Sequence, residues 1–233
     1  MGAPAGAWLY QKIIHYCDVH RDQDYPDIIC HNNANIPDRT RAIVGGETSP
    51  LTELTRTAAL FNYAEVDALV MACMTAYYFK DELQPYFNGV ILDPVQMAIE
   101  ALQSLERVGR VGLIGSTGLL SSKLYHERLG AYGYEVINLS AEDQEKYFMQ
   151  PIYTKGGIKS GNPTEEVKAT FLAQLDILKD QGASVILGAC SEVPLVITTT
   201  PKNISFIDVF DLLARNTARY CYGKEVSQLN RQY

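Results

Sequence analysis

Short apolar runs alternate with longer amphipathic segments along the whole chain. The two clearest runs, 68–72 and 183–189, each lead directly into a cysteine, Cys73 and Cys190. Continuous apolar runs of this length are typical of strands that are buried on both faces of a parallel sheet. Because ligands of open α/β sheets bind at the carboxyl ends of the strands, the two thiols stand where a functional site is expected.

The pattern predicts the remaining elements. Helices are expected at 7–17, 51–63, 94–107, 119–129, 163–179 and from 208, and further strands at 25–30, 89–92, 110–114, 134–137 and 204–207. Ser49-Pro50 is a helix start signal and Asn162 is a good N-cap residue. Strands that alternate with helices predict an α/β fold with parallel sheets.

The two halves of the chain resemble each other in their order of elements. The sequence therefore predicts two pseudo-symmetric lobes, each a parallel sheet flanked by helices, with the active site in the cleft between them. We expect residues 1–95 to form the first lobe, completed by the C-terminal helix 208–233, and residues 96–207 to form the second. The second half has a strand, 110–114, before its glycine-rich turn, whereas the first half begins at the turn. The first lobe is thus expected to lack its first strand; a lobe with one strand fewer explains the pattern equally well.

Composition and charge narrow the functional classes. The chain has 233 residues, 47% of them hydrophobic, and a formal net charge of −7, which suits one large domain or two compact lobes. No apolar run approaches the roughly 20 residues of a membrane span, and no basic leader with an apolar core is present, so we expect a cytoplasmic protein. Lysines and arginines are scattered singly, which disfavours nucleic acid and anionic membranes as partners.

The five cysteines are best explained as free thiols. Their number is odd, and no CxxC pair or Cys/His cluster has the spacing of metal ligands. Cys17, Cys30 and Cys221 are explained as small buried hydrophobes. Cys73 and Cys190 fit that explanation less well, because a strand end that opens a helix stabilises a thiolate. Two such groups on opposite lobes could remove a proton from one face of a carbon acid and return one to the other face, without a redox cofactor.

Motifs around these cysteines resemble a known family. Cys73-Met74-Thr75-Ala76 and Cys190-Ser191-Glu192-Val193-Pro194-Leu195 resemble the paired CNTA and CTE-x-P-L motifs of the aspartate/glutamate racemase superfamily. The segments 22–26, 35–40 and 2–4 are similar to motifs of its aspartate racemase branch. The resemblance implies a homodimeric isomerase that needs no pyridoxal phosphate or other cofactor, acts on a small dicarboxylic amino acid, and uses Cys73 and Cys190 as its acid/base pair.

The resemblance also implies a set of substrate-binding residues. It assigns Asp38 and Arg39 of the Ile36–Thr40 motif and, in the interlobe loop, Lys159. A guanidinium and an ammonium suit a dicarboxylate, although taken alone both side chains would be ordinary surface cations. Four hydroxyl residues could bind the α-carboxylate or equally cap helices: Thr75, Ser116, Thr117 and Ser191.

Two further side chains have both a functional and a structural explanation. Glu192 is expected to orient a thiol or bind the substrate ammonium, or else to form a structural ion pair. Asn33 is expected to line the cleft, or else to form a turn.

Three departures from the family pattern bear on the substrate. Met74, Tyr77 and Ser191 stand where Asn, His and Thr are usual. The serine keeps the hydroxyl, whereas Met74 loses a polar contact to the amino acid. The leading hypothesis is racemisation of an acidic amino acid, with aspartate favoured. The alternatives are a related isomerase, of the maleate isomerase or hydantoin racemase type, and a catalytically silent binding relative.

Overall fold

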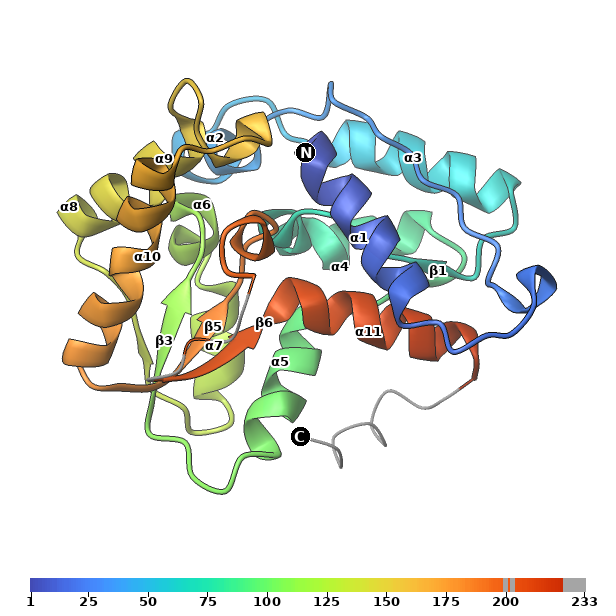
Figure 1. Cartoon of the computed structure of the whole chain (residues 1–233). Coiled ribbons are helices and arrows are strands. Elements are labelled where there is room, and N and C mark those ends of the chain that lie inside the picture. The colour runs from blue at the N-terminus through green and yellow to red at the C-terminus, as the bar shows by residue number, and fades with distance from the viewer. Residues whose placement is uncertain (199–200, 202–203, 224–233) are drawn as a thin grey trace.

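The computed structural model describes residues 1–198, 201 and 204–223. It contains two parallel sheets flanked by helices (Figure 1), as the sequence predicted. The first sheet pairs β1 (Ala68–Leu69) with β2 (Val90–Ile91). The second has the order β4 (Val136–Ile137), β3 (Arg110–Ile114), β5 (Ala183–Gly188) and β6 (Ser205–Asp208). No helix in the described part of the chain is long and apolar enough to cross a membrane.

Eleven α-helices are found among the described residues. They are α1 (Ala3–His15), α2 (Arg39–Gly45), α3 (Leu51–Tyr63), α4 (Lys80–Leu83), α5 (Pro94–Gln103), α6 (Thr117–Ser121), α7 (Leu124–Gly130), α8 (Ala141–Asp143), α9 (Gln150–Tyr153), α10 (Glu165–Asp180) and α11 (Val209–Cys221). Short 3₁₀-helices cover Asp22–Asp24, Met74–Phe79, Gln84–Tyr86, Ile158–Ser160 and Val193–Leu195, and a π-helix covers Gln144–Met149.

The sheet of the second lobe is centred on β3 and β5. Their five paired positions run from Arg110↔Ala183 to Ile114↔Gly188. Val111, Leu113 and Leu187 of these strands are all at most 1% exposed, because helices cover both faces of the sheet. The carboxyl end of β5 is therefore rigid, and it presents Cys190 two residues beyond its last residue.

The sheet of the first lobe is much smaller than predicted. Strand β1 ends at Leu69 rather than running to Ala72, and the predicted strand 25–30 forms no strand. Among the described residues β1 has one neighbour, β2, and none of them forms a strand before α1. A cavity lies between the helices beside β1, and residues 26–33 line its wall. Without a paired neighbour, an extended segment gains no ladder hydrogen bonds, so both predicted strands lose regular structure.

Helix α1 covers Ala3–His15 rather than the predicted 7–17, and α5 ends at Gln103 rather than at 107. Two further helix boundaries also differ from the prediction. The helix predicted at 119–129 is divided into α6 and α7, because Lys123 adopts a left-handed conformation (φ 59°) and the hydroxyl of Ser122 donates to Leu119 O instead. Helix α10 begins after Thr164, whose hydroxyl accepts from Val167 N, whereas Asn162 lies outside it. In both places local hydroxyl hydrogen bonds decided the boundary.

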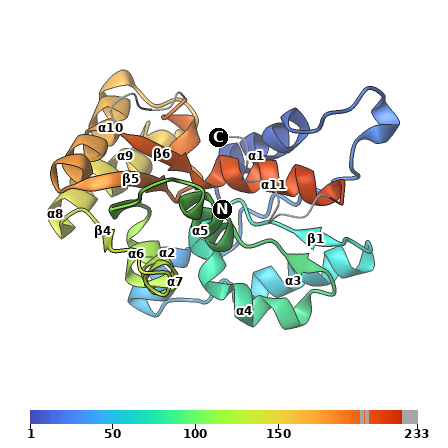
Figure 2. The same cartoon turned by 90° about the horizontal axis from the view of Figure 1, so that it is seen from below.

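The C-terminal helix returns to the first half of the chain. Helix α11 packs along α1, and the rings of Trp8 and Phe210 stack with centroids 5.2 Å apart. Figure 2 shows α1 and α11 together on one side of β1 and α3 on the other. Residues 224–233 of the predicted helix 208–233 lie outside the described residues, and the domain limits remain a prediction.

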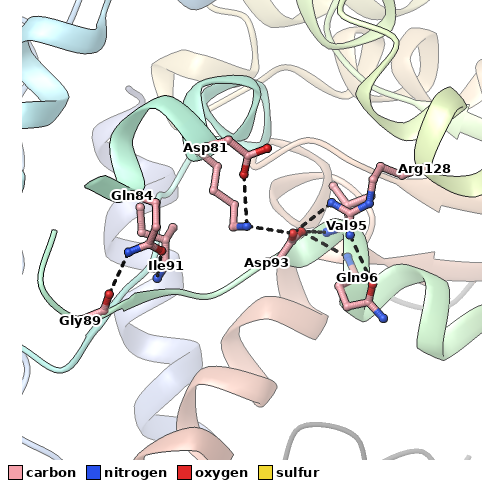
Figure 3. Close-up of polar contacts among 9 residues, drawn as sticks. Asp81, Gln84, Gly89, Ile91, Asp93, Val95, Gln96 and Arg128 are labelled. Carbon is pink, nitrogen blue, oxygen red and sulfur yellow. Dashed lines mark hydrogen bonds and ion pairs between the residues drawn. The ribbon is translucent and has the colours of Figure 1, made fainter. Parts of the chain in front are cut away.

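Asp93 connects the two halves at the end of β2. Its carboxylate caps α5 by accepting from Val95 N and Gln96 N, and it pairs with Lys80 at 3.3 Å and Arg128 at 3.1 Å (Figure 3). Burial raises the pKa of Asp93, but the two cations outweigh it and hold that pKa below its ordinary value. One carboxylate thus ties α4, α5 and α7 together.

Asp93→Ala is expected to lower the free energy of unfolding by about 2 kcal/mol, since it removes a helix cap and the partner of two cations. For a chain of this size that is a fall in Tm of about 4–8 °C. Asp93→Asn keeps an oxygen that can cap α5, so its free energy of unfolding should fall by about half as much as that of Asp93→Ala. Because the folded pKa is lowered, the contribution of Asp93 is present above about pH 4 and fades as the pH falls below it.

Thermal unfolding at several pH values checks this. Asp81→Asn is the matched control, because Asp81 also pairs with Lys80 but its side chain is 97% exposed, so a change below about 0.5 kcal/mol is expected. Equal losses at positions 81 and 93, or a difference between wild type and Asp93→Asn that persists at pH 2, would contradict the role given to Asp93.

Candidate active site

A small cavity lies between the two halves of the chain, and both predicted cysteines line it. Its volume is about 20 Å³, which is room for a water molecule and far less than an amino acid needs. Its wall consists of Gly2, Asp38, Arg39, Thr40, Cys73, Met74, Thr75, Ser116, Phe148, Ile152, Tyr153, Lys159, Cys190, Ser191 and Glu192. The structure thus brings ten of the twelve predicted site residues together in a closed form, and a substrate requires the halves to separate.

Cys73 is held at the turn that follows β1. It precedes the 3₁₀-helix Met74–Phe79 and has an extended backbone. The buried hydroxyl of Tyr77 accepts a hydrogen bond of 2.9 Å from Met71 N, which fixes the backbone two residues before the thiol. Burial raises the pKa of Tyr77, so this hydroxyl stays neutral. Tyr77 therefore stabilises the turn through Met71, and its side chain does not line the cavity.

Cys190 is buried next to a carboxylate. Its Sγ donates to Glu192 Oε2 at 3.0 Å, and Ser191 Oγ donates to the same oxygen at 2.9 Å. Burial and the negative charge of Glu192 raise the pKa of the Cys190 thiol well above its ordinary value. Cys190 is therefore protonated in this closed form and available as an acid.

Arg39 faces the other cysteine. Its guanidinium is buried, and Nη1 donates to Ile36 O at 3.1 Å and Pro37 O at 2.7 Å, while Nε has no hydrogen-bond partner among the described residues. Burial lowers the pKa of Arg39, but attraction to the Cys73 sulfur outweighs burial and raises it. Arg39 is therefore a fixed positive charge beside Cys73 with a donor left over.

Lys159 brings a second cation to the cavity. Its Nζ lies over the Tyr153 ring, 4.3 Å from the centroid. Burial lowers its pKa, but Glu192 and Tyr153 outweigh burial and raise it, so the side chain is charged. Asp38 is committed to a structural contact instead: its carboxylate accepts from Arg41 N at 2.9 Å as the N-cap of α2.

The hydroxyl residues have local partners in the closed form. Thr75 Oγ1 and Ser116 Oγ lie 2.7 Å apart and join the two halves, and Ser116 also caps α6 by accepting from Leu119 N. Met74 is 2% exposed and contributes an apolar part of the wall. Opening the halves would free both hydroxyls for a ligand.

Two predicted site residues lie elsewhere. Thr117 is the first residue of α6 and does not line the cavity. Asn33 is turned toward α3, where it donates to Glu53 Oε2 at 3.1 Å and accepts from Asn35 N. The turn-forming explanation of Asn33 is therefore the right one, because its amide is used within its own loop and against α3.

Five wall residues were not predicted as site residues. Gly2 and Thr40 lie in the motif segments 2–4 and 35–40, whereas Phe148, Ile152 and Tyr153 lie outside every motif. Phe148 comes from the π-helix, to which the apolar pattern assigned no element. Ile152 and Tyr153 come from α9, where the sequence predicted the start of a loop, 152–162. The i,i+4 spacing of Phe148 and Ile152 would place them on one helical face, and it is the signal that could have found them.

Gly118 sets the distance between the helix that carries Arg39 and the second half. A Cβ atom at Gly118 would lie 2.7 Å from Thr40 Cα, so Gly118→Ala is expected to push α2 away. We expect the kcat/KM of the reaction at this site to fall at least about tenfold, since a misplacement of about 1 Å can cost a factor of 10². Gly130→Ala is the control, because a Cβ there meets nothing within 4 Å. Equal activities of the two variants would contradict this positioning.

Comparison with known proteins identifies the family. A family model described as Asp/Glu/hydantoin racemase matches residues 1–217. The chain belongs to this racemase family. The result confirms the predicted family and the predicted class of enzyme, a racemase.

Individual racemases of this kind are distant in sequence but similar in structure. The broad specificity amino-acid racemase RacX of Bacillus subtilis is 23% identical over 230 residues, 93% of each chain. The structure of Picrophilus torridus aspartate racemase matches with a TM-score of 0.82 at 23% identity, over 99% of this chain and 94% of that one. Francisella tularensis glutamate racemase, solved with D-glutamate, gives 0.64 at 14% identity, over 97% and 80%. These structural matches confirm the racemase fold.

Proposed function

We propose that this protein racemises aspartate without a cofactor, by proton transfer between two cysteines. The observation that carries the proposal is the placement of Cys73 and Cys190, from opposite halves of the chain, on the wall of one closed cavity. A thiol and a thiolate on opposite sides of a bound carbon acid are the two groups that inversion of the centre requires.

The proton balance follows from the different surroundings of the two sulfurs. In the direction that starts with a protonated Cys190, Cys73 acts as the base that removes the α-proton, and the Cys190 thiol gives its proton to the opposite face. The α-carbon thus loses one proton and gains another, while Cys73 ends protonated and Cys190 ends as a thiolate. Turnover in the reverse direction, or proton exchange with water, restores the starting state. Arg39 and Lys159 each interact electrostatically with Cys73. Both cations would also stabilise the negative charge that develops on the substrate.

The cations favour a dicarboxylic substrate. Arg39 and Lys159 supply two positive charges to a small site. Two cations can each pair with one carboxylate of a dicarboxylic amino acid, whereas an uncharged hydantoin ring has no carboxylate to pair with them. The free Nε of Arg39 is available for the side-chain carboxylate. Met74 contributes an apolar side chain to the wall where the family pattern has asparagine. Selection between amino-acid substrates therefore rests on the two cations rather than on polar contacts beside Cys73.

Deuterium incorporation tests the proposal. The purified protein is incubated with L-aspartate in D₂O, without added cofactor, and the α-proton signal and the amount of D-aspartate are followed. Loss of the signal together with formation of D-aspartate is expected. L-glutamate, L-alanine, maleate and a hydantoin serve as comparisons. Turnover of maleate or the hydantoin in preference to aspartate would favour the related isomerases, and inertness of the folded protein toward all of them would favour a silent binding relative.

Glu192→Gln is expected to move the alkaline limb of the pH profile. Removing the negative charge beside Cys190 lowers the pKa of that thiol, so kcat/KM should begin to fall at lower pH than in the wild type. The measurement is kcat/KM between pH 6 and pH 10 or so, the range over which thiols titrate. Glu166→Gln, on the exposed first turn of α10, is the control. An unchanged alkaline limb in Glu192→Gln would show that Cys190 is not the acid.

The homodimer and the cytoplasmic location remain predictions from the sequence. Sedimentation of the purified protein tests the first, and fractionation of the producing cells tests the second.

A further inference from the structure

The loop that carries Cys73 is closed on itself by one side chain. It runs from Met71 to Tyr77, and the hydroxyl of Tyr77 accepts a hydrogen bond of 2.9 Å from Met71 N. Within this loop, Cys73 N donates to Met71 O at 2.7 Å, and Ala76 N donates to Cys73 O at 3.0 Å. Met71 is therefore held at its N–H and at its carbonyl, and both backbone groups of Cys73 have partners inside the loop.

Tyr77 stands where a longer β2 would continue. Leu92 N donates to Leu69 O at 3.1 Å, so the backbone groups of Leu69 face β2. Those of Met71, two residues farther along an extended chain, face the same side, because backbone groups alternate in direction along a strand. The chain that follows β2 turns away at Asp93 to begin α5. The Tyr77 hydroxyl thus supplies Met71 with the acceptor that the next residue of a strand would have given.

This hydrogen bond is buried at both ends. The side chains of Met71 and Tyr77 belong to the core of the first half. Burial raises the pKa of Tyr77, so the hydroxyl accepts without bringing a negative charge next to the thiol. A buried N–H without a partner is strongly disfavoured. If the hydroxyl is removed, the loop must move to give Met71 N another acceptor, and Cys73 lies only two residues away.

The loop reaches the cavity between the two halves only near its thiol. Residues 73–75 are on the wall of that cavity, whereas Met71 and Tyr77 are not. The second sulfur has no part in this loop, because Cys190 donates to Glu192 at 3.0 Å within its own turn. A change at Tyr77 therefore reaches one sulfur and leaves the other in place.

We propose that Tyr77 is a positioning residue for Cys73, whose sulfur it holds at the correct distance from the substrate, and that it has no such effect on Cys190. The inference rests on the proposed racemisation by two cysteines and assigns one residue to one face of that reaction. A defect at Tyr77 slows proton transfer on the Cys73 side alone. The family pattern has histidine at this position, so the phenol hydroxyl is a departure of this chain from that pattern.

The test places Tyr77→Phe, which removes the hydroxyl and keeps the ring, in two single-cysteine variants. In Cys190→Ala only Cys73 can exchange the α-proton of aspartate with D₂O, and in Cys73→Ala only Cys190 can. Because a misplacement of about 1 Å can cost a factor of 10², we expect exchange to slow at least about tenfold in the first variant and to stay within about twofold in the second. With both cysteines present, kcat should fall while KM stays nearly unchanged.

Tyr125→Phe is the matched control. Tyr125 is 0% exposed and Tyr77 is 2% exposed, but the hydroxyl of Tyr125 has no hydrogen-bond partner among the described residues. Its removal should leave exchange unchanged in both single-cysteine variants. Equal slowing on both faces, no slowing on the Cys73 face, or the same slowing by Tyr125→Phe would overturn the proposal. A lack of exchange in both single-cysteine variants before Tyr77 is altered would instead contradict the racemisation on which the inference rests.

Amide exchange at Met71 is a second measurement, and it can be made on the unaltered protein. The hydrogen bond to Tyr77 should protect this amide from exchange with deuterium, and Tyr77→Phe should remove that protection. Exchange of Met71 in the unaltered protein as fast as that of an exposed amide would overturn the proposal even if Tyr77→Phe fails to fold.

Discussion

Cys73→Ala and Cys190→Ala should each abolish racemisation while leaving one half of the chemistry intact. Removing one acid/base group is expected to lower kcat by about 10³ or more, within or above the usual range for general acid–base catalysis. The sulfur that remains still faces one side of the bound substrate. Each variant should therefore exchange the α-proton of one enantiomer with D₂O and leave the other enantiomer inert.

The two variants are expected to act on opposite enantiomers, because their thiols come from opposite halves of the chain. Proton exchange of L- and D-aspartate, followed separately by NMR, measures this. Cys30→Ser is the control and should keep wild-type rates. Cys30 and Cys221 are exposed free cysteines and Cys17 is half-buried, so the prediction that these three are buried hydrophobes was wrong. Racemisation by either alanine variant within tenfold of wild type would exclude the two-base mechanism, and so would exchange of the same enantiomer by both.

Arg39→Lys is expected to lower kcat/KM for aspartate by a factor of about 10 to 10². Lysine keeps the positive charge but loses the planar fork and the donors that hold Ile36 O and Pro37 O. A charge-assisted hydrogen bond contributes about 1.5–3 kcal/mol, and each 1.4 kcal/mol is a factor of ten. Arg39→Ala, which also leaves Cys73 without its facing cation, should lose more.

The ratio of aspartate to alanine turnover distinguishes the two roles of Arg39. If its free donor binds the side-chain carboxylate, the variant loses activity toward aspartate and much less toward alanine. If Arg39 only holds the loop, both activities fall together, and the assignment of the carboxylate is wrong. Arg41→Lys is the matched control on the same helix, because its side chain is 71% exposed and pairs with Glu47 only at 3.9 Å.

The site could be predicted where a short stretch of sequence determines the geometry. Cys190, Ser191 and Glu192 are adjacent, and their hydrogen bonds are formed within that triplet. Asp38 is the N-cap of the helix that begins at Arg39. Contacts between residues that are close in sequence do not depend on how distant segments fold together. A short motif is therefore enough to predict them. The family motifs named ten of the fifteen wall residues, although the segments that carry these motifs lie far apart in the chain.

Contacts between distant segments were not predictable in this way. The Thr75–Ser116 hydrogen bond and the approach of Arg39 to Cys73 depend on how the halves pack. Asn33 lies in a predicted site loop, yet α3 supplied Glu53 as its partner. Phe148 of the π-helix packs against Phe171 of α10, with ring centroids 5.5 Å apart, and the sequence of the π-helix alone does not predict this contact.

Apolar periodicity and local capping are properties of neighbouring residues, so the sequence alone was enough to predict the alternation of strands and helices and the position of Cys190 just beyond β5. It did not place Cys73 correctly, because β1 ends at Leu69, four residues before that thiol. Only the tertiary structure decided which predicted strands form. The residues of 25–30 and of 70–72 have the composition of strands, but a strand exists only through the partner that accepts its hydrogen bonds, and β1 has such a partner on one side alone among the described residues.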